Sequence, residues 1–217
     1  MMNTTFNLFE ENFEIYVEKK LQEIGYKTLR SIYLRVGEYE SQIDIMAFGY
    51  GNIVCIECKS MVMTKLQFGR KRVKWVYTDE DGKDHPMPSV LTQNCNHINT
   101  IKMFLQQENY LVSIREEFGI PVPIIVNACI FKDSLELPNL SPSIRKANGV
   151  YRVKDLNLIQ ELNFVKDTEV DIRNKVGEKI LSILEPFVDT SNKRKVQHGL
   201  YIRECKKNKL GYFRGLN

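Results

Sequence analysis

The chain has 217 residues, of which 43% are hydrophobic and 27% are charged, so it can bury one good core and is not expected to be disordered. Its net charge of +4 is mild but uneven, because residues 190–217 carry +7 and residues 1–189 carry −3. We expect one domain over 1–189 and a basic C-terminal extension over 190–217, which either contacts a phosphate backbone or is solubilising coil.

Cysteine content and the start of the chain bear on location. The five cysteines are sparse and odd in number. The first residues have neither a basic start nor a long apolar segment. These features predict free thiols, a cytoplasmic protein and no membrane segment. Cys55 and Cys58 have the spacing of a zinc knuckle, but no second pair of Cys or His follows at a suitable distance, so we expect no zinc.

The first part of the chain predicts one helix and then strands. Apolar residues at helical spacing predict an amphipathic helix over 7–24, which ends at Gly25. Three runs rich in β-forming residues follow, at 27–35, 41–48 and 52–60. The tight turn Tyr50-Gly51-Asn52 favours antiparallel pairing of the last two runs.

The remainder predicts alternating strands and helices. A short strand at 73–78 is followed by a helix over 89–108, for which Ser89 is a plausible N-cap. The later elements are a buried strand at 124–131, a short strand at 150–153, a short helix at 155–161 and an amphipathic helix over 172–187. Thr168 and Asp171 resemble a capping box before that last helix. This order predicts an α/β fold, a mixed β-sheet flanked by helices.

Two adjoining strands carry a suggestive set of charges. Asp44 lies in the apolar run Gln42-Ile43-Asp44-Ile45-Met46, and Glu57 and Lys59 lie two residues apart in the next strand. Side chains alternate along a strand, so Glu57 and Lys59 share a face, and Asp44 can meet them if the strands pair. The alternative is an ordinary surface ladder with a Glu-Lys pair, in which Val54, Ile56 and Cys58 form the core face.

Two carboxylates and an ammonium at one point favour metal-dependent phosphodiester hydrolysis. Asp44 and Glu57 would bind Mg²⁺, for which Mn²⁺ can substitute, and the backbone carbonyl of Cys58 would add a third oxygen. Lys59 would orient or deprotonate the attacking water, or stabilise charge on the phosphate.

On these residues the chain resembles the nuclease-related domain (NERD) family, within the PD-(D/E)XK restriction-endonuclease-like superfamily. The resemblance covers about residues 9–131. It rests on the blocks Phe13-Glu14, Ser41-Gln42-Ile43-Asp44, Ile56-Glu57-Cys58-Lys59-Ser60, Trp75, and Gln93 with His97. The family usually has Asn-Pro shortly before the glutamine, whereas this chain has Met87-Pro88-Ser89.

The resemblance implies a nuclease core with Asp44 and Glu57 at the metal and Lys59 at the water. It also implies an assisting acid on the first helix. Spacing leaves Glu10, Glu14 and Glu18 open, and the family match points to Glu14. The resemblance further implies that Gln93 positions a phosphate or a water, although Gln93 also suits an ordinary polar position at a helix start.

Further residues are candidates for contact with nucleic acid. Gln42 would support Asp44, and His97 lies one helical turn after Gln93, where a packed histidine is the alternative. The other candidates are basic: Lys65, Arg70, Lys71, Arg72 and Lys74. They surround Trp75 and would form a phosphate track, although Trp75 itself is better explained as a cover for the core.

We therefore expect a metal-dependent nuclease acting on DNA. The alternatives are a non-catalytic module of the same fold, which binds nucleic acid or recruits a partner, and an enzyme that acts on RNA. Double-strand cutting by one small domain would require a homodimer.

Overall fold

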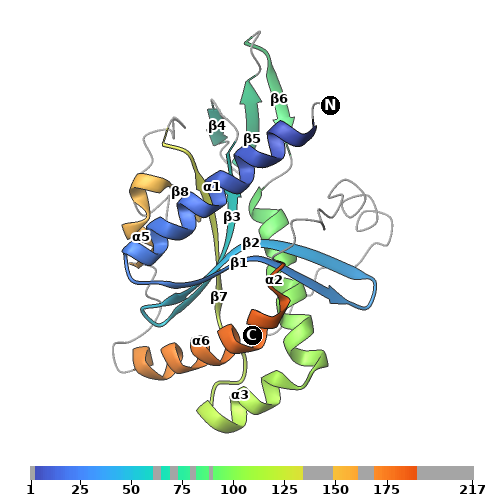
Figure 1. The fold of residues 1–217 in the computed structure, drawn as a ribbon, viewed down its shortest axis with the longest axis vertical. Helices are drawn as coiled ribbons and strands as arrows, with labels where there is room; N and C mark the ends of the chain where they lie inside the picture. Colours follow the sequence, from blue (N-terminus) through green and yellow to red (C-terminus); the bar gives the residue numbers. More distant parts are fainter. Residues whose placement is uncertain are drawn as a thin grey trace.

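The computed structural model describes residues 3–60, 65–68, 73–78, 82–87, 90–133, 149–160 and 169–189 (Figure 1). The predicted basic extension over 190–217 lies outside these residues, as do Arg70, Lys71 and Arg72.

The main sheet has five strands in the order β1-β2-β3-β7-β8. Their bounds are β1 Lys27–Val36, β2 Tyr39–Gly49, β3 Asn52–Lys59, β7 Ile125–Phe131 and β8 Val150–Arg152. The first three strands pair antiparallel, and β3, β7 and β8 pair parallel. The sheet is therefore mixed, and the predicted α/β fold with helices on a mixed sheet is confirmed.

Helices cover both faces of this sheet. One face packs on α1 (Asn3–Glu23) and α5 (Asn157–Gln160), and the other on α2 (Val90–Gln107), α3 (Tyr110–Phe118) and α6 (Val170–Leu184) (Figure 1). Two 3₁₀ helices, η1 (Val153–Asp155) and η3 (Glu185–Phe187), complete the described elements. Since the two faces form two separate clusters of buried residues, β3 is buried on both sides. None of the described helices is long and apolar enough to span a membrane.

The predicted hairpin of β2 and β3 is present. The turn residues Tyr50 and Gly51 have φ of 54° and 73°, as expected for the tight turn that matches the twist of a hairpin. The register pairs Ile45 with Ile56 and Gly49 with Asn52. This register brings the Asp44 end of β2 beside the Glu57 end of β3.

A second sheet was not predicted as such. It has three strands, β4 (Lys65–Phe68), β5 (Val73–Thr78) and β6 (Asp84–Met87), in the order β4-β5-β6. Only β5 was expected. The strand β6 contains Pro86, which a strand tolerates because β6 is an edge that pairs with β5 alone. Figure 1 places this sheet at the end of the molecule opposite α3 and α6.

Two other expectations about helices need correction. The helix α3 was not predicted, and it starts after Asn109, whose left-handed φ of 58° separates it from α2. The N-cap of α6 is Glu169, which forms no capping hydrogen bond through its side chain. Thr168 of the expected capping box lies outside the described residues.

Buried Asn94 fixes α2 against the sheet. Its amide nitrogen lies 2.7 Å from the carbonyl oxygen of Cys55, 3.0 Å from that of Ala128, and 2.7 Å from Oδ1 of Asn127. Its own Oδ1 accepts from the Cys55 thiol at 3.0 Å. A single side chain from α2 thus binds both β3 and β7.

We predict that Asn94→Ala lowers the free energy of unfolding by about 3 kcal/mol, because it leaves buried polar groups without partners. Urea denaturation followed by circular dichroism measures the change. The matched control is Asn99→Ala, since Asn99 is exposed on the same helix and should change stability by less than about 0.5 kcal/mol. Equal effects in the two variants would refute the anchoring role.

Candidate active site

The regular alternation of side chains between the two faces of the sheet shifts by one residue where β1 and β2 pass Asp44. In β2, Ile43 and Met46 belong to the core cluster under α2, whereas Ile45 lies in the cluster under α1. Opposite this point in β1, Ser31 has a left-handed φ of 56°. A residue in that conformation rotates the strand locally, as a bulge does. The slip lets a polar residue leave the buried alternation of β2 at Asp44.

Asp44 lies at the point where β2 and β3 stop pairing. The last paired residues are Ile45 and Ile56. Beyond them the backbone N–H of Cys58 donates to Oδ2 of Asp44 at 2.8 Å. The N–H and C=O of one residue point to the same edge of an extended strand, so the Cys58 carbonyl also faces the side of Asp44.

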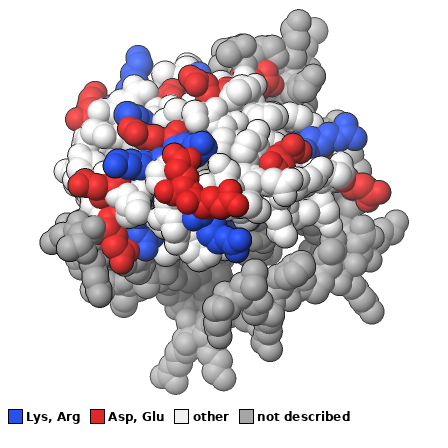
Figure 2. Space-filling model, turned by 90° about the horizontal axis from the view of Figure 1, so that it is seen from below, with Lys and Arg blue, Asp and Glu red and all other residues white. Residues whose placement is uncertain are grey.

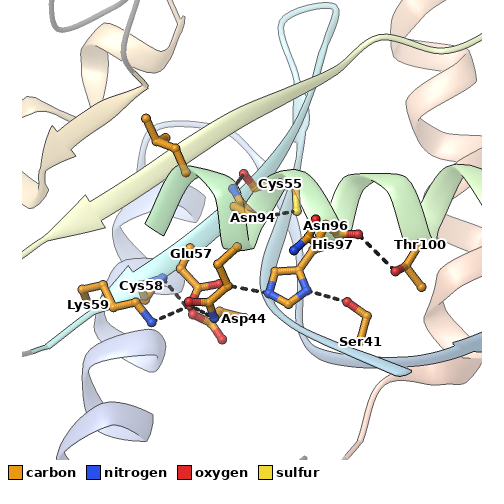
Figure 3. Close-up of polar contacts among 12 residues, drawn as sticks. Ser41, Asp44, Cys55, Glu57, Cys58, Lys59, Asn94, Asn96, His97 and Thr100 are labelled. Carbon is orange, nitrogen blue, oxygen red and sulfur yellow. Dashed lines mark hydrogen bonds and ion pairs between the residues drawn. The ribbon is translucent and has the colours of Figure 1, made fainter. Parts of the chain in front are cut away.

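Glu57 is the buried centre of the site, with 2% of its surface exposed (Figure 3). Its Oε1 accepts from Nζ of Lys59 at 2.6 Å and from Nε2 of Gln93 at 2.7 Å. Its Oε2 lies 3.3 Å from Nε2 of His97. Lys59 comes from the same strand, and Gln93 and His97 come from successive turns of α2. Asp44, Glu57 and Lys59 therefore converge, as the strand pairing led us to expect.

The carboxyl groups of Asp44 and Glu57 differ widely in pKa. Burial and the nearby Glu57 carboxylate raise the pKa of Asp44 to about 7. Burial alone would raise the pKa of Glu57, but the nearby His97 ring and the charge of Lys59 outweigh it and lower that pKa to about 2. The first proton that the pair gains therefore goes to Asp44. A cation between the two groups would relieve their repulsion.

The structure separates Glu14 from Glu18 as candidates for the assisting acid on α1. Glu14 lies close enough to Cys58 that, after burial and Asp44, its charge contributes to the raised pKa of that thiol. Glu18 instead accepts from Arg30 at 3.1 Å and from Thr28 at 3.0 Å. The side chain of Glu10 lies outside the described part of the chain. Glu14 is thus the candidate that the fold brings near the site.

The predicted contacts to nucleic acid fall in different places. His97 is only 4% exposed and stands behind Glu57, so in this conformation it cannot touch a phosphate directly. Gln42 is half-buried opposite Tyr33, two residues before Asp44. Lys65 and Lys74 lie on β4 and β5, but their side chains, like Arg70, Lys71 and Arg72, are outside the described part.

Sequence reasoning missed Ser41. Its hydroxyl is hydrogen-bonded to Nδ1 of His97, and both side chains are buried. The only signal was its place at the start of the Ser41-Gln42-Ile43-Asp44 block, where it reads as an ordinary strand residue. The sequence also did not predict that helices cover both faces of β3. Because they do, the alternative of a solvated surface ladder is wrong for Glu57.

The donor set suits a hard divalent cation with solvent in its shell. Within the described residues, no three His, Cys, Asp or Glu side chains form a ready cluster for a metal. Magnesium commonly takes one or two carboxylates and keeps several waters. The raised pKa of Asp44 beside a second carboxylate is the observation that makes such an ion fit here.

Comparison with known proteins gives one family match and weak similarity to solved structures. The model of the nuclease-related domain family matches residues 7–125. No curated protein sequence matches the chain. Two solved structures share weak similarity of fold. A protein of unknown function, AF1548, is 12% identical with a TM-score of 0.34, covering 92% of this chain and 97% of its own. Can2 from Sulfobacillus thermosulfidooxidans, solved with cyclic tetra-adenylate, is 14% identical with a TM-score of 0.31, covering 75% and 35%.

We predict that Asp44→Asn stabilises the protein at pH 8 in the presence of a chelator, by about 2 kcal/mol. The pKa of Asp44 is raised in the folded state, so ionisation of this carboxyl lowers the free energy of unfolding as pH rises from about 4 to about 7. Asparagine cannot ionise, and its oxygen can still accept from Cys58. Urea denaturation at pH 5 and pH 8 should therefore show a gain that is larger at pH 8.

The matched control is Asp171→Asn, because Asp171 is an exposed acid on α6. It should give no gain at either pH. A loss of stability in Asp44→Asn at pH 8 would contradict the strained carboxylate pair.

Proposed function

Because the chain belongs to the nuclease-related domain family, we propose that it is a metal-dependent nuclease that hydrolyses phosphodiester bonds in DNA. One observation supports this above the others. Asp44, Glu57 and Lys59 converge where β2 and β3 separate, so two acidic groups and an ammonium meet at the point where these two strands no longer pair. PD-(D/E)XK nucleases are consistent with this family and with a mixed sheet flanked by helices.

Asp44 and Glu57 would hold Mg²⁺, or Mn²⁺ in its place, with the Cys58 carbonyl as a further oxygen. Such an ion supplies Lewis-acid stabilisation and a more acidic water. Asp44 suits this role because it is half-buried and engages one oxygen, Oδ2, with the protein; among the described residues its Oδ1 has no partner. Glu14, near Cys58, would assist from the side of α1.

Lys59 would stabilise charge rather than accept a proton. Its Nζ lies 2.6 Å from the ionised Glu57, and an ammonium in such a pair is a donor without a lone pair. It is 21% exposed, unlike the 2% of Glu57, so it can also reach a ligand. A phosphate oxygen or the attacking water would accept from it. Gln93, which donates to the same oxygen of Glu57, would position the same groups.

The distribution of charge on the end of the molecule with α3 and α6 does not favour binding of DNA there. Figure 2 views the molecule from the side of α3 and α6, where acidic and basic side chains are interspersed. Pairs such as Lys179 with Glu117 at 3.1 Å and Lys27 with Glu178 at 2.6 Å neutralise each other there. A polyanion gains little on a mixed surface. The strands β4 and β5, which carry Lys65 and Lys74, stand at the other end (Figure 1).

We predict that Asp44→Asn and Lys59→Ala each lower the rate of plasmid nicking in Mg²⁺ or Mn²⁺ by about 100-fold or more, since the first weakens a ligand of the cation and the second removes the ammonium that would stabilise the reacting phosphate. Gel electrophoresis of supercoiled DNA measures the rate. Lys179→Ala removes an exposed lysine from α6 and should nick at the wild-type rate. Wild-type activity in Asp44→Asn or Lys59→Ala would disprove the assignment.

The rival function is a non-catalytic module that binds nucleic acid or recruits a partner. Calorimetry with Mn²⁺ separates the two. We expect one Mn²⁺ to bind the wild-type protein and none to bind Asp44→Asn. No binding by the wild type, with binding of DNA retained, would favour the module.

Whether the enzyme acts on DNA or on RNA requires a separate experiment. Cleavage of DNA and RNA strands of matched sequence should be faster for DNA. Faster cleavage of RNA would assign the enzyme to that substrate, and double-strand cuts would imply that two copies act together.

A further inference from the structure

A buried chain of three side chains runs from β2 through α2 to β3. Ser41 bonds Nδ1 of His97, and Nε2 of His97 lies 3.3 Å from Oε2 of Glu57 (Figure 3). The three residues are 3%, 4% and 2% exposed. Ser41 lies three residues before Asp44 on the same strand. The chain therefore links the strands that carry the two carboxylates.

We propose that His97 is a positioning residue, which Ser41 orients, and that it holds the Glu57 carboxylate so that Oε1 is presented to the divalent cation. The proposal rests on the nuclease function proposed above. It assigns His97 no contact with nucleic acid.

The proton on His97 is constrained to face Glu57. An ionised carboxylate only accepts hydrogen bonds, so Nε2 must carry hydrogen. If the ring is neutral, the Ser41 hydroxyl donates to Nδ1; if the ring is cationic, Nδ1–H donates to Ser41. In both states the hydrogen of Nε2 lies on the side of Oε2 of Glu57, 3.3 Å from the nitrogen, a contact that falls short of a hydrogen bond in this conformation. Ser41 therefore fixes the ring in the orientation that serves Glu57.

The two oxygens of Glu57 face different surroundings. Oε2 is fully buried, accepts no hydrogen bond from the described residues and faces His97 at 3.3 Å, whereas Oε1 accepts from Gln93 and the partly exposed Lys59. Without the His97 ring, this buried oxygen would lose its contact to a polar group, and the carboxylate would rotate to find a donor. His97 thus keeps Oε1 on the side that a ligand can reach.

Two variants at position 97 test this. His97→Phe keeps a ring of similar size but removes both nitrogens, and His97→Gln keeps an N–H donor. Mn²⁺ affinity of the full chain is measured by electron paramagnetic resonance. His97→Phe should weaken binding by about 10- to 100-fold, as loss of a residue that orients a metal ligand does. His97→Gln should restore it to within about threefold of the wild type.

Thr100→Val is the matched control. Thr100 is buried on the same helix, and its hydroxyl bonds only the Asn96 carbonyl at 3.1 Å among the contacts described. It should bind Mn²⁺ like the wild type. Affinity in His97→Phe equal to that of the wild type, with the fold intact by circular dichroism, would overturn the proposal.

A second measurement covers a His97→Phe variant that fails to fold. The chain has three histidines, so ¹⁵N nuclear magnetic resonance of the wild type can assign His97 by its loss in His97→Gln. A hydrogen on Nε2, with weaker Mn²⁺ binding in Ser41→Ala, supports the proposal. A neutral ring with its hydrogen on Nδ1 overturns it.

The failure of the nuclease function is distinguishable from failure of this proposal. A wild-type protein that binds no Mn²⁺ refutes the metal site, and the positioning role falls with it. Wild-type binding that His97→Phe leaves unchanged refutes the positioning role alone.

Discussion

An ionised carboxylate at 2% exposure is stable only when donors surround it, and this requirement at Glu57 governs how α2 lies on the sheet. Lys59 donates from the same strand and Gln93 donates from α2, and the His97 ring of α2 lies 3.3 Å from the other oxygen. A shift of the helix by one residue would remove both of these contacts from α2. The amide of Asn94 fixes the helix in that register, because it binds the backbone of β3 and β7 directly beside Glu57. Packing and charge therefore specify the same position of α2.

Much of this site follows from sequence. The period of two along β3 puts Glu57 and Lys59 on one face, and the turn at Tyr50-Gly51 brings Asp44 to them. These are local rules, and they hold because the turn leaves little choice of register. The cover over Glu57 could not be predicted in this way. An acidic and a basic residue on alternate positions of a strand are typical of a solvent-facing side, and only the docking of α2 makes that side an interior.

Other features depend on contacts distant in sequence. Ser31 adopts a left-handed φ of 56°. A serine in a sequence does not predict that conformation, whereas a glycine can. A strict alternation would place Ile43 and Ile45 on one face, and the structure separates them. Four-residue strands such as β4 and β6 carry too few residues for a periodic signal, and Pro86 argues against a strand unless the edge position is known. Helical spacing put His97 on the side of Gln93 but left open whether it contacts substrate or packs, because spacing gives a direction on the helix but not what lies there.

The site occupies the place where the main sheet stops being continuous between β2 and β3. A ladder that continued past Ile45 and Ile56 would consume the backbone N–H of Cys58, which instead binds Asp44. It would also pair the Cys58 carbonyl with a strand partner and leave it unavailable to the proposed cation. The strands β2 and β3 thus do not pair at the site, which holds two neighbouring carboxyl groups. The pKa of one of them, Asp44, is raised to about 7. Both features oppose stability, and a cation bound as proposed above would offset that cost by relieving the repulsion between the carboxylates. The interrupted ladder, more than any single residue, is therefore the feature on which the proposed metal site rests.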